Sequence, residues 1–214
     1  MSPARLIRLG QFEQVPNRRF ADPQHSYADV TVLEYMRARL RETLCGANID
    51  ATDPVNRELY IQSIKEDGER LHRLVILSRQ QLLNAATLTV VGFFGHKRSA
   101  AKPAILQDID TELLQEFLHH TYVLSYSSLE LPDRNWANMV LMLDATGIEH
   151  WRASQRHAYA ARELAPHFYD SIRLHNGTLP GGLAAPHLIL LSTKYYDYSG
   201  DNWWHAIRDF RSNS

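Results

Sequence analysis

The segment HWRASQRH, residues 150–157, holds the side chains with the most evident chemical potential. A metal ion bound by both of its histidines would need each imidazole nitrogen within about 2.1 Å. On a helix, His150 and His157 lie two turns apart, roughly 10 Å along the axis, whereas helical ligand pairs are spaced at i and i+4. The spacing therefore predicts no shared metal. His157 is instead a candidate proton acceptor, because the ordinary pKa of histidine is about 6.5.

A polar residue inside an apolar stretch supplies the second candidate. In WANMVLMLD, residues 136–144, the alternation of a strand places Trp136 and Asn138 on the same face. A buried amide needs hydrogen-bond partners, so Asn138 is a candidate for binding an oxygen atom of a ligand. Core packing is the alternative interpretation of Trp136 and Trp151, and a place on the helix surface or at an interface is the alternative for His157.

Composition excludes several other classes of function. The formal net charge is −1 and no dense run of Lys and Arg occurs, so we expect no nucleic-acid partner. Cys45 is the only cysteine, which excludes an intrachain disulfide and a cysteine-rich zinc site. The first residues lack the pattern of a secretory signal, and no apolar run approaches the roughly 18 residues of a membrane span. We therefore expect a cytoplasmic protein with no metal and no membrane partner.

Hydrophobic periodicity predicts a mostly helical segment over residues 1–86. After a short strand within residues 5–12, the apolar stripe predicts a helix over 30–44. Asp53 and Pro54 are typical of a helix start, and the stripe that follows predicts a long helix from residue 54 to about residue 84. Gly68 weakens this helix by roughly 1 kcal/mol relative to alanine.

From residue 88 the pattern predicts a β-α-β-β-α-β order, the ferredoxin-like arrangement. Its module spans residues 87–198, and residues 199–214 are expected to form a short C-terminal helix or tail. One face of the sheet takes the two helices, and the other needs a cover, for which dimerisation is the usual answer and the N-terminal helices are the alternative. The predicted strands cover 88–94, 122–131, 136–144, 168–176 and 187–196, and the predicted helices cover 103–120 and 147–165.

The segment IEHWRASQRHAYAARELAPHFYDSIRLHNG resembles the second helix and the following strand of antibiotic-biosynthesis-monooxygenase-like proteins. Its matching residues are Trp151, Ser154, His157, Tyr169 and Arg173. The resemblance extends over roughly residues 88–196, about half of the chain. It implies an α+β fold of the dimeric α/β-barrel superfamily, in which the ferredoxin-like module pairs into a homodimeric barrel. Residues 1–86 have no counterpart in it.

The resemblance implies activity on a small molecule in a cavity between the sheet and the helices. The first activity is oxygenation of a small aromatic or polyketide-type substrate without a cofactor. It implies two catalytic residues, His157 and Asn138, and four substrate-binding residues, Trp136, Trp151, Tyr126 and Arg152.

Two alternatives stay open beside the oxygenase. One is haem binding or haem degradation; in the family members with that activity, the iron-binding histidine lies ten residues after the helix tryptophan, and Ala161 stands at that position here. His157 comes one turn too early for this role. The other alternative is a non-catalytic protein that binds a ligand or serves in assembly.

Overall fold

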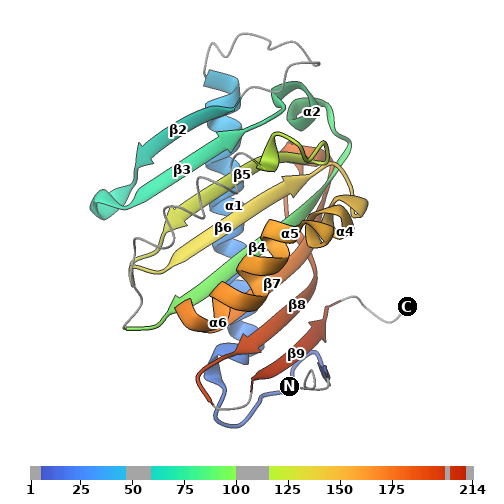
Figure 1. Ribbon diagram of the computed structural model, residues 1–214. Helices are drawn as coiled ribbons and strands as arrows, with labels where there is room; N and C mark the ends of the chain where they lie inside the picture. The colour runs from blue at the N-terminus through green and yellow to red at the C-terminus, as the bar shows by residue number, and fades with distance from the viewer. Residues whose placement is uncertain (1–5, 47–58, 100–115, 201–202, 211–214) are drawn as a thin grey trace.

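A single open sheet of nine strands runs through the computed structural model, which describes residues 6–46, 59–99, 116–200 and 203–210 (Figure 1). The strand order is β1-β9-β8-β7-β4-β6-β5-β3-β2. Only the β1–β9 pair is parallel among these neighbours, and the other pairs are antiparallel. The strands are β1 Ile7–Leu9, β2 Tyr60–Lys65, β3 Leu71–Ile76, β4 Thr87–Lys97, β5 Val123–Glu130, β6 Trp136–Met142, β7 Tyr169–Pro180, β8 Ile189–Asp197 and β9 Trp204–Asp209.

The prediction of a ferredoxin-like module that forms a dimeric α/β barrel is wrong. The strands predicted over 88–94, 122–131, 136–144 and 168–176 are present as β4, β5, β6 and β7. They form only the middle of the sheet, which continues through β8, β9 and β1 on one side and through β3 and β2 on the other. The sheet does not close. The helix predicted over 103–120 lies mostly outside the described residues.

A long helix, α1 (Pro23–Gly46), covers one face of the sheet and lies behind it in Figure 1. Its fully buried side chains recur every three or four residues, which is the spacing of one helix face. Gly92 of β4 makes room for this helix, since a side-chain carbon there would lie 2.6 Å from Leu33 Cδ1. The barrel dimer was expected to use this face, which α1 occupies instead. The buried α1 residues of this core are Leu33, Met36, Leu40 and Leu44.

The opposite face is crossed by a chain of short helices, which lie in front of the sheet in Figure 1. They are α4 Thr146–Ala153, α5 Gln155–Tyr159, a single π-helical turn at Ala160–Leu164, and α6 Ala165–Phe168. A second, smaller core forms under them around Phe117, Val123 and Met142. None of the described helices combines the length and the apolar character needed to cross a membrane.

The long helix predicted over 54–84 is also wrong where the structure describes it. β2 and β3 form a hairpin with a short 3-10 turn at Asp67–Glu69 between them, and among the described residues of this range only α2 (Arg79–Asn84) is α-helical. Gly68 lies in the turn of the hairpin with φ 73°, a left-handed conformation that glycine adopts without strain and that ends a right-handed helix. Residues 47–58, which include the predicted helix start, lie outside the described residues. At the C-terminal end, residues 204–209 form β9 rather than a helix or tail.

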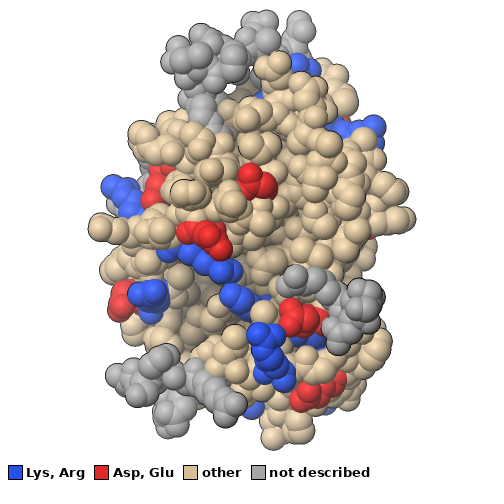
Figure 2. Space-filling model, turned by 90° about the vertical axis from the view of Figure 1, so that its right-hand side faces the viewer, with Lys and Arg blue, Asp and Glu red and all other residues tan. Residues whose placement is uncertain are grey.

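Acidic and basic side chains are both present on the surface. Figure 2 shows a row of Lys and Arg side chains across one side of the molecule, with Asp and Glu side chains beside it and wide uncharged areas. Acidic and basic side chains therefore lie next to one another on this side of the molecule.

Arg208 of β9 fastens the N-terminal segment to the sheet. Its side chain is fully buried. The guanidinium donates to the carbonyl oxygens of Gln11 (3.1 Å), Glu13 (2.7 Å) and Ala21 (2.9 Å), and also to that of Gly10. One cation thus satisfies several backbone acceptors of a segment whose described regular structure is a short 3-10 turn at Arg19–Ala21.

Replacing Arg208 by methionine should lower the free energy of unfolding by about 3 kcal/mol or more, because buried carbonyl groups lose a charged donor. Urea unfolding followed by circular dichroism measures the loss. Arg8→Met is the matched control: its ion pair with Asp209 (3.1 Å) is exposed, and exposed pairs contribute less than about 1 kcal/mol. Equal losses in both variants would contradict this role of Arg208.

Candidate functional site

The helix predicted over 147–165 is broken where it carries the candidate residues. Ser154 is extended (φ −62°, ψ 131°) and ends α4. Its Oγ accepts a hydrogen bond from the backbone N of His157 (3.1 Å) and so caps α5. After the break the two histidines face different rings: His150 stacks on Tyr122 at 5.0 Å, and His157 packs on Trp151 at 5.1 Å between ring centroids.

Rings from the helix and the sheet form one continuous group, here called the Trp151 cluster. Trp151 stacks on Phe117 with 4.9 Å between centroids and 19° between planes. Phe117 in turn contacts Tyr126 of β5 at 5.2 Å, and His120 meets the edge of Trp151 at 4.9 Å. With His157, these side chains lead from the helix layer down to the sheet. The cluster consists of Phe117, His120, Tyr126, Trp151 and His157.

Asn138 joins the cluster through a hydrogen bond. The hydroxyl of Tyr126 donates to Asn138 Oδ1 at 3.1 Å, which supplies the partner that a half-buried amide needs. The amide nitrogen of Asn138 makes no hydrogen bond to another described residue, so it can donate to a ligand. Asn138 stands in a row of cross-strand neighbours on this face of the sheet: Arg73, Ser128, Asn138, Phe93, Leu174 and Lys194.

His157 is neutral at physiological pH. Burial lowers its pKa to about 4; the charge of Glu116 opposes this shift, and the charges of Arg152 and His120 add to it. A neutral imidazole keeps one nitrogen able to accept a proton. Its ring makes no hydrogen bond to another described residue. His157 therefore has the protonation state of a general base.

Tyr169, which only the resemblance pointed to, reaches the same layer from the start of β7. Its ring lies across Gly95, where a side-chain carbon would come within 2.3 Å of Tyr169 Cε1. It also contacts the edge of Phe93 at 5.3 Å. Burial raises the pKa of Tyr169, and the nearby Tyr126 raises it further. The hydroxyl thus stays protonated and can donate.

Glu116 is a site residue that the sequence reasoning missed. The hydroxyl of Ser154 donates to Glu116 Oε1, and Nε2 of His120 lies 3.7 Å from the same atom. Glu116 Oε2 is buried without a hydrogen-bond partner among the described residues. A carboxylate therefore lies beside the Trp151 cluster at the break between α4 and α5.

The remaining predicted residues lie farther from this group. Trp136 begins β6 beside Glu130 and Gly95 and makes no ring contact with the Trp151 cluster among the described residues. Arg152 is exposed. The structure therefore joins Tyr126, Asn138, Trp151 and His157 and leaves the other two at the margin.

The charge of Arg152 reaches as far as β8. Burial lowers the pKa of Lys194, and the charge of Arg152 lowers it further; the same charge opposes the rise that burial causes in the pKa of Tyr196. Lys194 ends the row of cross-strand neighbours that contains Asn138. Arg152 and Lys194 therefore bring positive charge to the margin of the site.

Arg173, the last of the residues that match the resembling family, lies on the opposite face of the sheet. Its guanidinium donates to Asp29 of α1, Nε to Oδ2 at 2.5 Å and Nη2 to Oδ1 at 2.9 Å. Within the described part of the chain, no three His, Cys, Asp or Glu side chains are grouped so that they could hold a metal ion.

Comparisons with known proteins add no assignment. No protein-family profile matches the chain, and no curated protein matches it. Among solved structures, the crystal structure of protein SO0527 from Shewanella oneidensis is similar with a TM-score of 0.39 and 12% sequence identity. The match covers 50% of this chain and 95% of that one. A likeness this weak carries no conclusion about fold or function.

The protonation of His157 predicts how stability changes with pH. Its pKa in the folded protein is about 4, below the ordinary 6.5, so the unfolded chain binds a proton more readily. The stability that neutral His157 contributes is complete above pH 6.5 and is lost as the pH falls towards 4. NMR titration of the His157 ring should give the low pKa directly. His157→Gln should lose less stability between pH 7 and pH 5 than the wild type does; a measured pKa near 6.5 would contradict the burial.

Proposed function

We propose that this protein is a cofactor-independent oxygenase that acts on a small aromatic or polyketide-type phenol at the Trp151 cluster. One observation carries the proposal: a neutral histidine packs on a tryptophan in a group of rings that ends at a half-buried amide. Aromatic rings bind a flat substrate and exclude water, while the histidine accepts the proton of its hydroxyl group and the amide donates a hydrogen bond to the oxygen.

The chemistry follows from the protonation states. His157 accepts the proton of the phenolic hydroxyl, which leaves an electron-rich phenolate. The phenolate gives two electrons to dioxygen, and a carbon–oxygen bond forms to give a hydroperoxide on the ring. Cleavage of the oxygen–oxygen bond leaves a quinone carbonyl, and the departing oxygen takes its protons from the ring carbon and from His157 to form water. A phenol and dioxygen thus become a quinone and water.

Other side chains orient the substrate. The amide nitrogen of Asn138 donates to the phenolate oxygen, and the protonated hydroxyl of Tyr169 is a second donor in the same layer. Hydrogen bonds to a developing negative charge are worth more in a site that excludes water. Arg152 and Lys194 at the margin favour a substrate that carries negative charge.

The same proposal places the protein in the cytoplasm as a homodimer. Because α1 covers the face that a barrel dimer would use, such a dimer has to form through another surface. Sedimentation at micromolar concentration tests it, with twice the mass of one chain expected and the mass of a single chain contradicting it.

Replacing His157 by glutamine should lower the rate of substrate oxidation at least a hundredfold, the usual scale for the loss of a general base. Oxygen uptake with anthrone and naphthol as substrates measures the rate. His150→Gln is the matched control, because His150 is an exposed histidine on the preceding helix and stacks on a different ring.

Three results would argue against the oxygenase. Equal rates in the two variants would remove His157 from the reaction. Quenching of tryptophan fluorescence by the phenols without oxygen uptake would indicate a binding protein. A Soret band after addition of haem, abolished by His157→Gln, would indicate haem binding instead.

A further inference from the structure

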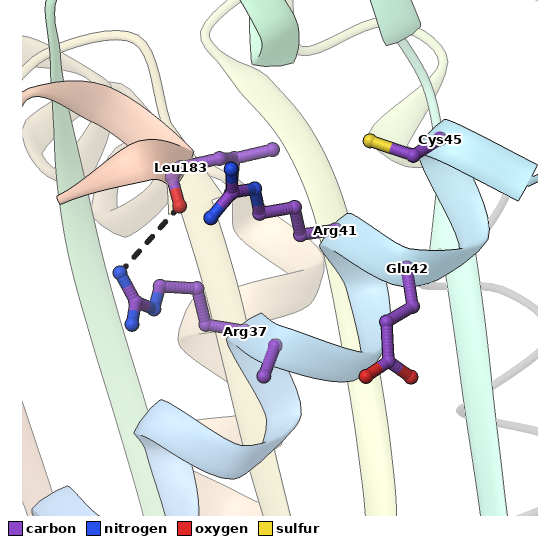
Figure 3. Close-up of a pocket in the computed structure, with 6 residues that line it drawn as sticks. Arg37, Arg41, Glu42, Cys45 and Leu183 are labelled. Atoms are coloured by element: carbon purple, nitrogen blue, oxygen red, sulfur yellow. Dashed lines mark hydrogen bonds between the residues drawn. The ribbon is translucent and has the colours of Figure 1, made fainter. Parts of the chain in front are cut away.

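A hollow of about 290 Å³ lies on the α1 side of the molecule, across the sheet from the Trp151 cluster. Arg37, Arg41 and Cys45 line it from α1 at intervals of one helical turn. Leu183 of η4 (Gly182–Ala184) closes the other side, as Figure 3 shows. The volume is close to the lower end of known small-molecule sites, which span roughly 300–1,000 Å³.

Two positive charges face this hollow. Arg37 donates to the carbonyl oxygens of Leu183 and Pro186, both at 3.5 Å, and to that of Ala185. These acceptors are neutral, so they leave the charge of Arg37 uncompensated. Arg41 is exposed and makes no hydrogen bond or ion pair with another described residue. In Figure 3 its side chain extends toward Leu183, on the same side of the helix as the guanidinium of Arg37.

Glu42 also lines the hollow, but its carboxylate and that of the nearby Glu34 are engaged with other groups. Glu42 pairs with Arg39 at 2.8 Å, and its carboxylate points away from Arg41 and Cys45 in Figure 3. Glu34 accepts a hydrogen bond from the backbone N of Leu188 at 3.0 Å and lies 3.5 Å from Nδ1 of His187. The hollow therefore keeps a net positive charge.

The wall opposite α1 is held in a fixed place. Gly181 and Gly182 have φ of 98° and 62°, and a side-chain carbon at Gly182 would lie 2.0 Å from the carbonyl oxygen of Ala85. This close packing and the bonds from Arg37 fix the turn that carries Leu183. A wall that is already ordered costs little conformational entropy when a ligand binds.

We propose that this hollow binds a small organic anion. Its carboxylate or phosphate group pairs with Arg41, since guanidinium groups bind both in a bidentate manner. Its short apolar body lies against Leu183 and Ala38. The site is independent of the Trp151 cluster, which lies on the other face of the sheet.

Binding of an anion can be measured through the labelling of Cys45, because this residue is the only cysteine of the sequence, is exposed, and lines the hollow. The rate at which N-ethylmaleimide, a neutral reagent, labels it should fall with increasing benzoate or phenyl phosphate until the effect saturates. Benzamide, which has the shape of benzoate without the charge, should not protect the thiol. Inorganic phosphate separates the two parts of the site: weaker protection than by phenyl phosphate shows that the apolar wall contributes.

Arg41→Gln should raise the Kd for benzoate at least tenfold, whereas Arg41→Lys should keep part of the affinity. Arg8→Gln is the control, because Arg8 is an exposed arginine on β1 and does not line the hollow. The Arg41 variants are expected to fold, since the side chain has no partner among the described residues. Three outcomes would overturn the proposal: no protection by any anion, equal protection by benzoate and benzamide, or unchanged affinity in Arg41→Gln.

Discussion

The buried carboxylate of Asp29 makes the contacts on which the position of α1 against the sheet depends. It binds Arg173 through both oxygens and accepts a hydrogen bond from His175 Nε2 at 2.8 Å, while His175 Nδ1 lies 2.8 Å from Thr193 Oγ1. Burial raises the pKa of Asp29, but the hydrogen bonds from His175 and Arg173 outweigh it and hold the pKa below its usual range. An ionised carboxylate in such a place is stable only with all its partners, so α1 has one position on the sheet.

The two faces of the sheet differ in the side chains they carry and in the helices that cover them. The α1 face is filled by leucine and methionine side chains, and on it Asp29, Arg173, His175 and Thr193 are linked by hydrogen bonds. The opposite face carries a row of polar and aromatic side chains under helices that are short and interrupted. A π-helical turn and an extended serine within one helix are typical of functional sites, because both disturb the regular hydrogen bonding. The candidate site therefore lies on the face with the weaker regular structure.

The local hydrophobic pattern of the sequence was sufficient to predict some helices and strands and insufficient for others. β-branched and aromatic runs predicted β4, β5 and β6, and the apolar stripe predicted the core of α1. The hairpin of β2 and β3 was predicted as helix because Ile61, Ile64, Leu71 and Leu74 also fit a helical spacing. Gly68 decides between the two, and its left-handed conformation becomes evident only when the strands pair.

Local sequence likewise predicts only part of the candidate site. A buried Asn138 was expected to have a partner, but the contact of Trp151 with His157 depends on the break at Ser154, which the helical pattern did not predict. The reach of Tyr169 across Gly95 and the stacking of Phe117 on Trp151 depend on contacts between distant segments. The extent of the sheet is equally non-local, since β3 pairs with β5 and β1 with β9. No local periodicity reports such pairings.

The pairing of β1 with β9 imposes an order on synthesis and folding. Ile7 lies opposite Ala206, so β1 can join the sheet only after β9, far later in the chain, has been made. Until then its backbone donors and acceptors have only water as a partner, and an unpaired strand is a hazard for association with other chains. β1 spans only Ile7–Leu9, and a strand so short offers little template for such contacts. The brevity of β1 thus limits unwanted strand pairing for as long as β9 has not been made.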